Sequence, residues 1–226
     1  MIISEHKQGT EEWHFDRQGC ITASESNIVN IVLNHDNKSA TYKTFRDYVR
    51  DKAIDRIKRK KNEIVIPTPI NSVHIQRGKE HEHLARMSYE NKFNINVTEI
   101  GFCKHKTIPN FGCSPDGIFN HEDKYGILEI KCPTRANHYK LIEDSVIEPN
   151  RIIQMDIQLL VTGALFCDYV SFNLDAVKGQ ELYVKRHWRH KELDQCKDAI
   201  LWLNDCIKDK VAELKKIPEE QLTWII

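Results

Sequence analysis

Two short stretches of the sequence decide the fold: Cys113-Ser-Pro-Asp-Gly-Ile118 and Ile127-Leu-Glu-Ile-Lys-Cys132. Both are typical of β-strands bounded by turn residues. The twelve residues 117–128 lie between Asp116 and Glu129, enough for a strand, a turn and a returning strand. Side chains alternate between the faces of a strand, so Glu129 and Lys131 point one way and Ile130 points to the core. If the two strands pair, Asp116 lies beside Glu129, and two carboxylates share one pocket with an ammonium group.

Such a set of side chains suits the hydrolysis of a phosphodiester. Hard carboxylate oxygens bind Mg²⁺, which accepts few protein ligands and keeps several waters. The metal polarises a phosphoryl oxygen and lowers the pKa of a bound water, which makes a nucleophile at neutral pH. Lys131 is suited to orient that water or to stabilise the charge that builds up on the phosphorane. The carbonyl oxygen of Ile130, between the two side chains, is a further candidate ligand.

The same pattern also has an interpretation that involves no chemistry. Asp-Gly is a common turn, and Glu-x-Lys on a half-exposed strand is often a solvated face, so the pattern alone indicates a nuclease only weakly. The flanking residues favour the functional interpretation. Ile127, Leu128 and Ile130 are typical of a buried strand, and charged side chains in such a strand require partners or a function.

Outward from this centre, the sequence predicts a helical N-terminal portion, about residues 1–93, and a sheet-containing core, about residues 94–226. A short helix opens near Thr10 and stops near Gly19, and Thr22-Ala-Ser-Glu25 has capping-box spacing before a second helix. Further helical periodicity covers residues 39–60, 70–91, 150–163 and 192–216. Strand-like runs cover residues 95–102, 112–119, 126–131, 169–174 and 181–187. With no internal repeat or low-complexity linker, we expect one mixed α/β domain of residues 1–226.

The composition narrows the class of protein. The chain has 226 residues, enough to bury a core, and 33 Lys and Arg balance 33 Asp and Glu, which is neutral evidence about a nucleic-acid partner. The seven cysteines are scattered without a Cys-x-x-Cys pair, which argues against a zinc knuckle or a disulfide framework. The first eight residues carry no hydrophobic run, and no later segment is long enough to cross a bilayer. We therefore expect a reduced, soluble, cytoplasmic protein without a membrane partner.

Four blocks follow one another in a fixed order along the chain. They are Trp13-His-Phe-Asp-Arg-Gln-Gly-Cys-Ile-Thr-Ala-Ser-Glu25, Gly78-Lys-Glu-His-Glu82, the pair Ser114-Pro-Asp-Gly117 and Leu128-Glu-Ile-Lys-Cys-Pro133, and Gln154-Met-Asp-Ile-Gln-Leu-Leu-Val-Thr-Gly163. Together they resemble the phage lambda exonuclease family, the YqaJ-type viral recombinases of the PD-(D/E)xK nuclease group. The blocks span residues 13–163, most of the chain. The resemblance implies a restriction-endonuclease-like fold, with a mixed central sheet flanked by helices.

The resemblance also implies roles for the residues of the nuclease motif. Asp116 and Glu129 would be metal ligands, with Ile130 lending its carbonyl oxygen. Lys131 would serve the attacking water. Glu82 would lie at the edge of the same site, where it orients water or helps to hold a second metal ion.

A second group of residues is implied to bind the 5′ end of DNA. Arg17, with Ser24, Thr22 and Ser114, would hold the terminal phosphate, because a guanidinium fork and hydroxyl groups near a helix start suit that anion. Without the resemblance, Arg17 is more simply a surface arginine on a short helix.

The last block departs from the family pattern. The family often shows Gln-x-Gln, whereas Asp156 takes the second position here, with Gln154 and Gln158 beside it. An acid so close to the metals would alter their affinity or shift the role to a neighbouring glutamine. All three are therefore candidate site residues.

The function implied by the resemblance is a metal-dependent 5′-to-3′ exonuclease. It would digest one strand of linear double-stranded DNA and leave a 3′ single-stranded overhang for recombination. The family also implies Mg²⁺, with Mn²⁺ able to substitute, a ring-shaped homotrimer and a single-strand annealing protein as partner. Two alternatives remain: an endonuclease or structure-specific nuclease on the same core, and a catalytically inactive DNA-binding scaffold. The Arg17 block argues against the first, and the intact motif argues against the second.

Overall fold

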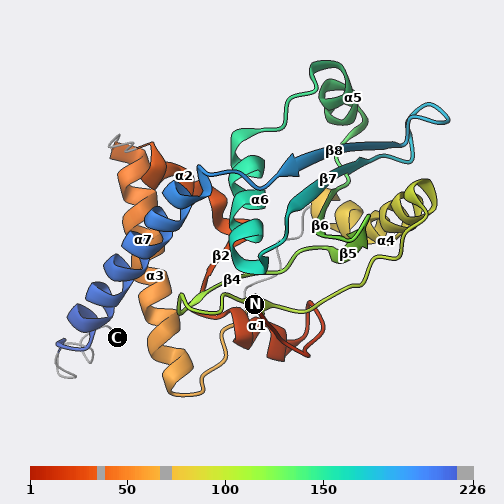
Figure 1. The fold of residues 1–226 in the computed structure, drawn as a ribbon. Coiled ribbons are helices and arrows are strands. Elements are labelled where there is room, and N and C mark those ends of the chain that lie inside the picture. The colour runs from red at the N-terminus through yellow and green to blue at the C-terminus, as the bar shows by residue number, and fades with distance from the viewer. Residues whose placement is uncertain (35–38, 67–72, 218–226) are drawn as a thin grey trace.

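The structure is a computed structural model that describes residues 1–34, 39–66 and 73–217. Two small sheets lie between groups of helices (Figure 1). In chain order the elements are β1 (Ile2–Ile3), α1 (Glu11–Arg17), β2 (Ile21–Thr22), the 3-10 helix η1 (Ala23–Glu25), α2 (Ser26–Leu33), α3 (Ser39–Lys60), α4 (Val73–Phe93), β3 (Cys103–Lys104), β4 (Phe111–Cys113), β5 (Gly117–His121), β6 (Lys124–Lys131), α5 (Arg135–Asp144), α6 (Pro149–Thr162), β7 (Phe166–Phe172), β8 (Leu182–Trp188) and α7 (Leu193–Leu214).

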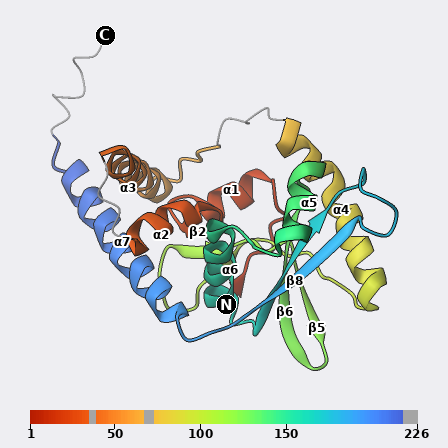
Figure 2. The same cartoon turned by 90° about the horizontal axis from the view of Figure 1, so that it is seen from above.

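The larger sheet has the strand order β5-β6-β7-β8 and contains both parallel and antiparallel pairs. β5 and β6 form an antiparallel hairpin, which projects from the sheet in Figure 2. Its two-residue turn, Glu122 and Asp123, has φ angles of 51° and 59°, as a type I′ turn requires. β6 and β7 run parallel, so the chain between them must cross over, and α5 and α6 make that crossover. β6 is therefore an interior strand with a neighbour on each side.

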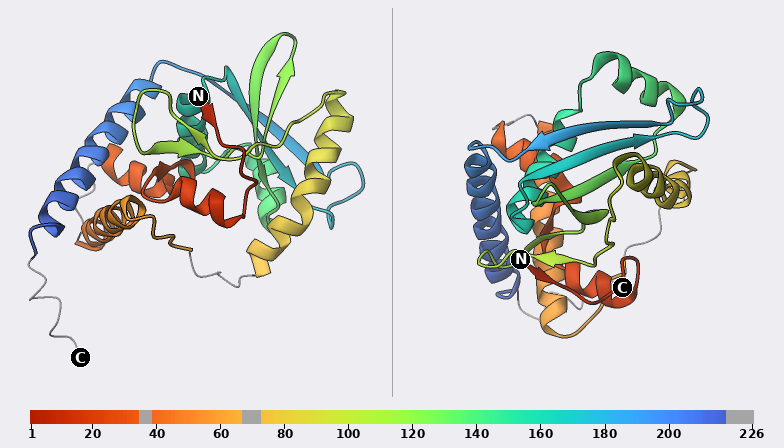
Figure 3. Two further views of the ribbon diagram at one scale, coloured as in Figure 1. Left: turned by 90° about the horizontal axis from the view of Figure 1, so that it is seen from below. Right: turned by 45° about the vertical axis from the view of Figure 1, so that its right-hand side comes forward.

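The smaller sheet, in the order β1-β3-β4-β2, draws strands from both parts of the sequence. β1 pairs with β3, and β2 pairs in parallel with β4. The N-terminal portion is thus not helical throughout, and it supplies two strands that the sequence pattern did not predict. Figure 3 shows the N-terminal segment in the middle of the molecule, between α7 and the β5–β6 hairpin.

Helices cover the two faces of the larger sheet, and the alternation along β6 decides which side chains meet them. Leu128 and Ile130 pack with Ala85 and Tyr89 of α4 on one face. Ile127 packs with α6 residues on the other face. Glu129 follows the same alternation and therefore points toward α6.

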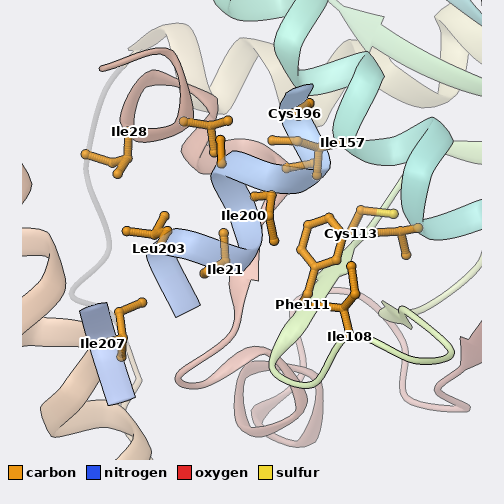
Figure 4. Packing of buried hydrophobic residues seen from close by; sticks show 14 of the residues in the cluster. Ile21, Ile28, Ile108, Phe111, Cys113, Ile157, Cys196, Ile200, Leu203 and Ile207 are labelled. Atoms are coloured by element: carbon orange, nitrogen blue, oxygen red, sulfur yellow. The ribbon is translucent and has the colours of Figure 1, made fainter. Parts of the chain in front are cut away.

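A second core joins α2, α3, α6 and α7 to the smaller sheet. Ile21 of β2, Phe111 of β4, Ile157 of α6, and Ile200 and Leu203 of α7 pack together in this cluster (Figure 4). α6 contributes side chains to this core and also to the core on one face of the larger sheet, so it links the two cores. The mixed α/β class is confirmed.

The helices agree well with the sequence prediction. α3 has the predicted bounds, and α6 and α7 differ from theirs by a residue or two. α4 begins at Val73 within the described residues, and the predicted start at residues 70–72 lies outside them. The helix α5 was not predicted; Thr134 caps it by accepting a hydrogen bond from the Asn137 N–H.

Two of the predicted strands are wrong. Residues 95–102 form only one bridge, in which Thr98 exchanges both backbone hydrogen bonds with Ile118. The predicted strand of residues 112–119 is divided into β4 and β5, which belong to different sheets. Pro115 stands at the division, where it cannot donate to either ladder. This break places Asp116 at the junction of the two sheets.

Two further expectations concern the whole chain. All seven cysteines are free, as expected for a chain without a disulfide framework. Among the described residues, no helix combines the length and the apolar character that crossing a membrane requires.

Candidate nuclease site

A cleft of about 1020 Å³ lies at the C-terminal end of β6, between α4 on one side and α5 with the start of α6 on the other. Four residues predicted for the site line it: Glu82, Asp116, Ile130 and Lys131. α4 and α5 lie on opposite sides of the strands (Figure 3), so the cleft crosses the edge of the sheet. Its other lining residues are Gly78, Cys132, Pro133, Asn137, Lys140, Leu141, Asp144, Val146, Ile147, Glu148, Pro149, Arg151 and Tyr169.

Hydrogen bonds to the backbone N–H and to the backbone carbonyl of Asp116 fix the position of this residue. Its N–H donates to the Leu128 carbonyl at 3.0 Å, and its carbonyl accepts from Arg86 Nη1 at 3.0 Å. Its Oδ2 accepts a hydrogen bond from the Ile130 N–H at 2.6 Å. Asp116 therefore lies directly beside the Glu129 position of β6, as the predicted strand pairing required.

The neighbouring Gly117 has a steric role. A Cβ atom at this position would lie 2.2 Å from Cγ1 of Val97, far inside van der Waals contact. Any larger residue at this position would force the Val97 side chain to shift.

Glu129 is nearly fully buried, with 2% of its surface exposed, and α6 supplies most of its partners. Gln154 Nε2 donates to Oε1 at 2.6 Å, and Gln158 Nε2 donates to Oε2 at 2.5 Å. Lys131 Nζ forms an ion pair with Oε1. Residues four apart lie on the same face of a helix, so the two glutamines can hold both oxygens of a single carboxylate. This arrangement satisfies a buried charge and fixes the plane of the carboxylate.

Arg151 extends this network into the cleft. Its Nη1 donates to Gln154 Oε1 at 3.2 Å, and the residue lines the cleft. The sequence analysis did not identify Arg151. The sequence did contain a signal for this contact: Arg151 precedes Gln154 by three residues, a spacing that places both side chains on the same face of a helix.

Burial and neighbouring charges shift the pKa values of three residues of the cleft. Burial raises the pKa of Asp116 well above its usual value, and the nearby charge of Glu129 raises it further. Burial also raises the pKa of Glu82, although the cations Arg86 and Lys131 oppose the effect. Burial lowers the pKa of Lys131, but the charges of Glu129 and Asp116 outweigh it, and the net shift is upward. Lys131 is therefore held as an ammonium group among carboxylates.

These donors fit a hard divalent cation. Oδ1 of Asp116 and the carboxylate of Glu82 accept no hydrogen bond from the part of the chain that the structure describes. Both residues line the cleft, and the repulsion among the acids is the kind that a divalent ion relieves. Asp116 and Glu82 are thus the residues most ready to hold Mg²⁺ or Mn²⁺. Glu129 and Ile130 are further candidates, although Glu129 already accepts hydrogen bonds at both oxygens.

The residues predicted for the 5′-phosphate form one connected group. Arg17 Nη2 donates to Ser24 Oγ at 3.0 Å, and the hydroxyls of Ser24 and Thr22 are 3.0 Å apart. The guanidinium of Arg17 lies 4.1 Å from the ring centroid of Trp13. Trp13 Nε1 in turn donates to Ser114 Oγ at 3.1 Å. Ser114 is two residues from Asp116, so this group adjoins the acidic cleft.

Asp156 does not join this site. Its Oδ1 lies 2.6 Å from His187 Nε2 and 3.0 Å from His190 Nε2, on the side of α6 that faces β8 and α7. The prediction that Asp156 acts beside the metals is therefore corrected by its contacts. At about 100° per residue, position 156 lies on nearly the opposite face of α6 from position 154. Gln154 and Gln158, in contrast, both reach Glu129.

Comparison with known proteins connects this geometry to a family. Residues 12–165 match the YqaJ-like viral recombinase domain. The chain belongs to this family. The resemblance drawn from the four sequence blocks is thereby confirmed. A mimivirus relative, the uncharacterized protein R354 of Acanthamoeba polyphaga mimivirus, is 26% identical over 121 residues, which cover 49% of this chain and 22% of that protein.

Solved structures give the same answer for the fold. The alkaline exonuclease LHK-Exo from Laribacter hongkongensis is 29% identical, with a TM-score of 0.77 over 92% of this chain and 97% of that one. A phage-related exonuclease from Haemophilus somnus 129PT has a TM-score of 0.59 at 11% identity over 86% of this chain and 96% of that one, so it supports the fold alone. The family and the LHK-Exo match together support a nuclease of this family.

Proposed function

We propose that this protein is a metal-dependent exonuclease that digests one strand of linear double-stranded DNA in the 5′-to-3′ direction and leaves a 3′ single-stranded overhang. The convergence of Glu82, Asp116 and Lys131 on one cleft, with Glu129 held directly behind them, carries the proposal. LHK-Exo has also been crystallised in complex with dAMP, a nucleoside monophosphate of the kind that such a reaction releases.

The residues of the cleft divide the chemistry among them. A bound Mg²⁺ or Mn²⁺ would polarise the phosphate and lower the pKa of a water molecule. Lys131 orients that water and stabilises the charge that develops on the phosphorane. Water adds to phosphorus, the bond from phosphorus to the 3′ oxygen breaks, and that oxygen gains a proton. Gln154 and Gln158 keep Glu129 in a fixed orientation throughout.

We propose the 5′-to-3′ direction from the connected residues Trp13, Arg17, Thr22, Ser24 and Ser114, called here the Arg17 group. Arg17, Ser24 and Thr22 offer one guanidinium and two hydroxyls, which suit a terminal phosphate. Ser114 connects this group to Asp116, so a 5′ end bound there would present the next phosphodiester to the cleft. The ring-shaped trimer, the annealing protein and a cytoplasmic location are proposed from the family resemblance.

The test uses linear duplex DNA labelled at either the 5′ or the 3′ end and incubated with Mg²⁺. The protein should release the 5′ label first, and Lys131→Ala should abolish that release. Lys124→Ala, at the other end of the same strand and exposed, is the matched control and should retain full activity.

Other outcomes would overturn the proposal in different ways. Release of the 3′ label first would reverse the polarity. Equal cutting of closed circles and linear DNA would indicate an endonuclease. Tight DNA binding without digestion in Mg²⁺ or Mn²⁺ would indicate a scaffold.

A further inference from the structure

Two histidines and an aspartate converge on the side of α6 that faces away from the cleft. Asp156 lies on α6, His187 lies near the end of β8, and His190 lies in the connection to α7. Both histidines direct Nε2 to the same carboxylate oxygen, Asp156 Oδ1, at 2.6 and 3.0 Å. Among the described residues, these three form a group whose possible ligand atoms all lie within 4.8 Å of one another.

The surroundings of the three residues are those of a built site. The side chains of Asp156 and His187 are 11% and 16% exposed, so two of the three ligands are largely shielded from water. The Nδ1 atom of His190 lies 2.8 Å from Glu192 Oε2. A carboxylate on the second nitrogen of a histidine is the usual partner of a metal-binding imidazole, because it fixes the tautomer and the ring orientation. His190 is 32% exposed, which leaves an approach from solvent for an ion and a water ligand.

We propose that Asp156, His187 and His190 bind a divalent transition-metal ion of the Zn²⁺ class, with Glu192 orienting His190. Two imidazole nitrogens and one carboxylate oxygen favour Zn²⁺, Co²⁺ or Ni²⁺ over Mg²⁺, which prefers oxygen ligands alone. Zn²⁺ bonds of about 2.0–2.1 Å place tetrahedral ligand atoms about 3.3 Å apart. From the observed 2.6 and 3.0 Å, the His187 nitrogen would have to move about 0.7 Å and the His190 nitrogen about 0.3 Å away from Asp156 Oδ1.

The site would join α6 to two consecutive segments, the end of β8 and the connection to α7, which lie 31 and 34 residues further along the chain. α6 carries Gln154 and Gln158, which hold Glu129, and an ion at Asp156 would fix the same helix to β8 and to the start of α7. The proposed ion is therefore structural and separate from the ion of the nuclease cleft. The chemistry of its three ligands carries the inference, which does not depend on the proposed nuclease activity.

The first experiment is a calorimetric titration of the metal-free protein with Zn²⁺ in excess Mg²⁺, which occupies the oxygen-rich cleft. One Zn²⁺ per chain should bind to the wild type, and His190→Ala should lose that binding. Glu192→Gln should bind Zn²⁺ about 10- to 100-fold more weakly, the usual effect of losing such a partner. His121→Ala, a histidine at the end of β5 outside this group, is the matched control and should bind as the wild type does.

A second measurement does not depend on affinity alone. Co²⁺ bound in place of Zn²⁺ should give the visible absorption of a four-coordinate nitrogen and oxygen site, and His187→Ala should remove it. Zn²⁺ should also raise the melting temperature of the wild type and leave that of His190→Ala unchanged. Because Glu192→Gln leaves all three ligands in place, it tests the proposal even if the histidine variants fold poorly.

The proposal fails if the wild type binds no Zn²⁺ under these conditions, since the three residues would then form only a hydrogen-bonded cluster. It also fails if the histidine variants, shown to be folded by circular dichroism, bind Zn²⁺ as the wild type does. In that case the ion occupies a cysteine or the nuclease cleft.

Discussion

Both carboxylate oxygens of Glu129 accept hydrogen bonds from glutamines of α6, so this helix sets the orientation of the carboxylate. Gln158 is 1% exposed, and its own Oε1 lies 3.7 Å from Cys167 Sγ. Gln158 therefore touches Glu129 without reaching the DNA. It is a positioning residue in the proposed mechanism.

Gln158→Leu should lower kcat at least about tenfold and leave KM for DNA within about twofold. The substitution removes the donor to Glu129 Oε2 while nearly preserving volume, so the loss concerns the transition state and not DNA binding. Steady-state kinetics on labelled duplex measure both constants, and Gln195→Leu on the exposed side of α7 is the control. A rise in KM at constant kcat would contradict a positioning role.

Asp16 is a second residue with a measurable consequence. It accepts hydrogen bonds from Ser4 Oγ at 2.5 Å and Lys104 Nζ at 2.6 Å, and His6 Nδ1 lies 2.8 Å away. Burial raises the pKa of Asp16, but the hydrogen bonds from these partners outweigh it and lower the pKa to about 2. Its ionised form therefore stabilises the fold and ties β1 and β3 to α1.

Asp16→Asn should lower the free energy of unfolding at pH 7 by about 2 kcal/mol, the value of a pKa shift from 3.8 to about 2. Because the folded-state pKa is depressed, this stabilisation is complete above about pH 4 and disappears as the pH falls toward 2. Denaturant unfolding at several pH values should show the two proteins converging in acid. Asp47→Asn, in an exposed pair with Arg50, is the control. A constant difference from pH 7 to pH 2 would rule out this linkage.

At the scale of the elements, the one buried residue of α5 is a histidine, His138. His138 is fully buried, its Nδ1 lies 2.8 Å from Ser171 Oγ, and its Nε2 lies 2.8 Å from the Gln180 carbonyl. These contacts fasten α5 to β7 and to the loop before β8. α5 forms one wall of the cleft, so its attachment affects the substrate site.

His138→Ala should destabilise the protein by about 2–4 kcal/mol, because it leaves a cavity and removes the partner of the buried Ser171 hydroxyl. It should also weaken DNA binding, since the α5 wall loosens, while Asp116 and Glu129 keep their contacts. Thermal unfolding and DNA titration measure the two effects, with His121→Ala as the control. An unchanged melting temperature would show that α5 is held by other contacts.

At the scale of the whole molecule, the Arg17 group and the cleft lie side by side although about a hundred residues separate them in sequence. The hydrogen bond from Trp13 to Ser114 joins α1 to the segment between the two sheets. Burial lowers the pKa of Arg17, which indicates that its guanidinium is partly removed from water. A partly desolvated guanidinium would bind an anion more strongly than a fully solvated one. In the proposed function, the short distance between the phosphate-binding residues and the acidic cleft would make the enzyme specific for DNA ends.

Arg17→Ala should reduce digestion of 5′-phosphorylated linear DNA by about 10- to 100-fold, the cost of charge-assisted hydrogen bonds. Digestion of DNA with a 5′-hydroxyl should change much less, since that end offers no terminal phosphate. Parallel assays on both ends, with Arg46→Ala of the exposed side of α3 as the control, give the comparison. Equal losses on both ends, or on closed circles, would contradict end recognition.

Much of the candidate site was predictable from the sequence. The alternation along residues 127–131 placed Ile130 in the core and Glu129 with Lys131 on the other face, and the spacing to Asp116 allowed the observed pairing. These features depend on strand geometry over a few residues, which the local pattern contains. The four blocks likewise predicted the family, because each keeps its own residues in a fixed order.

The tertiary structure alone decided the partners of those residues. The position of Asp156 in the glutamine block led us to expect it close to the metals, whereas it meets His187 and His190. A sequence motif does not show which element covers each face of its helix. β1 and β2 were missed because two-residue strands carry no pattern and exist only through pairing with β3 and β4. Local residue order therefore determined the motif, while contacts between distant segments determined which groups it faces.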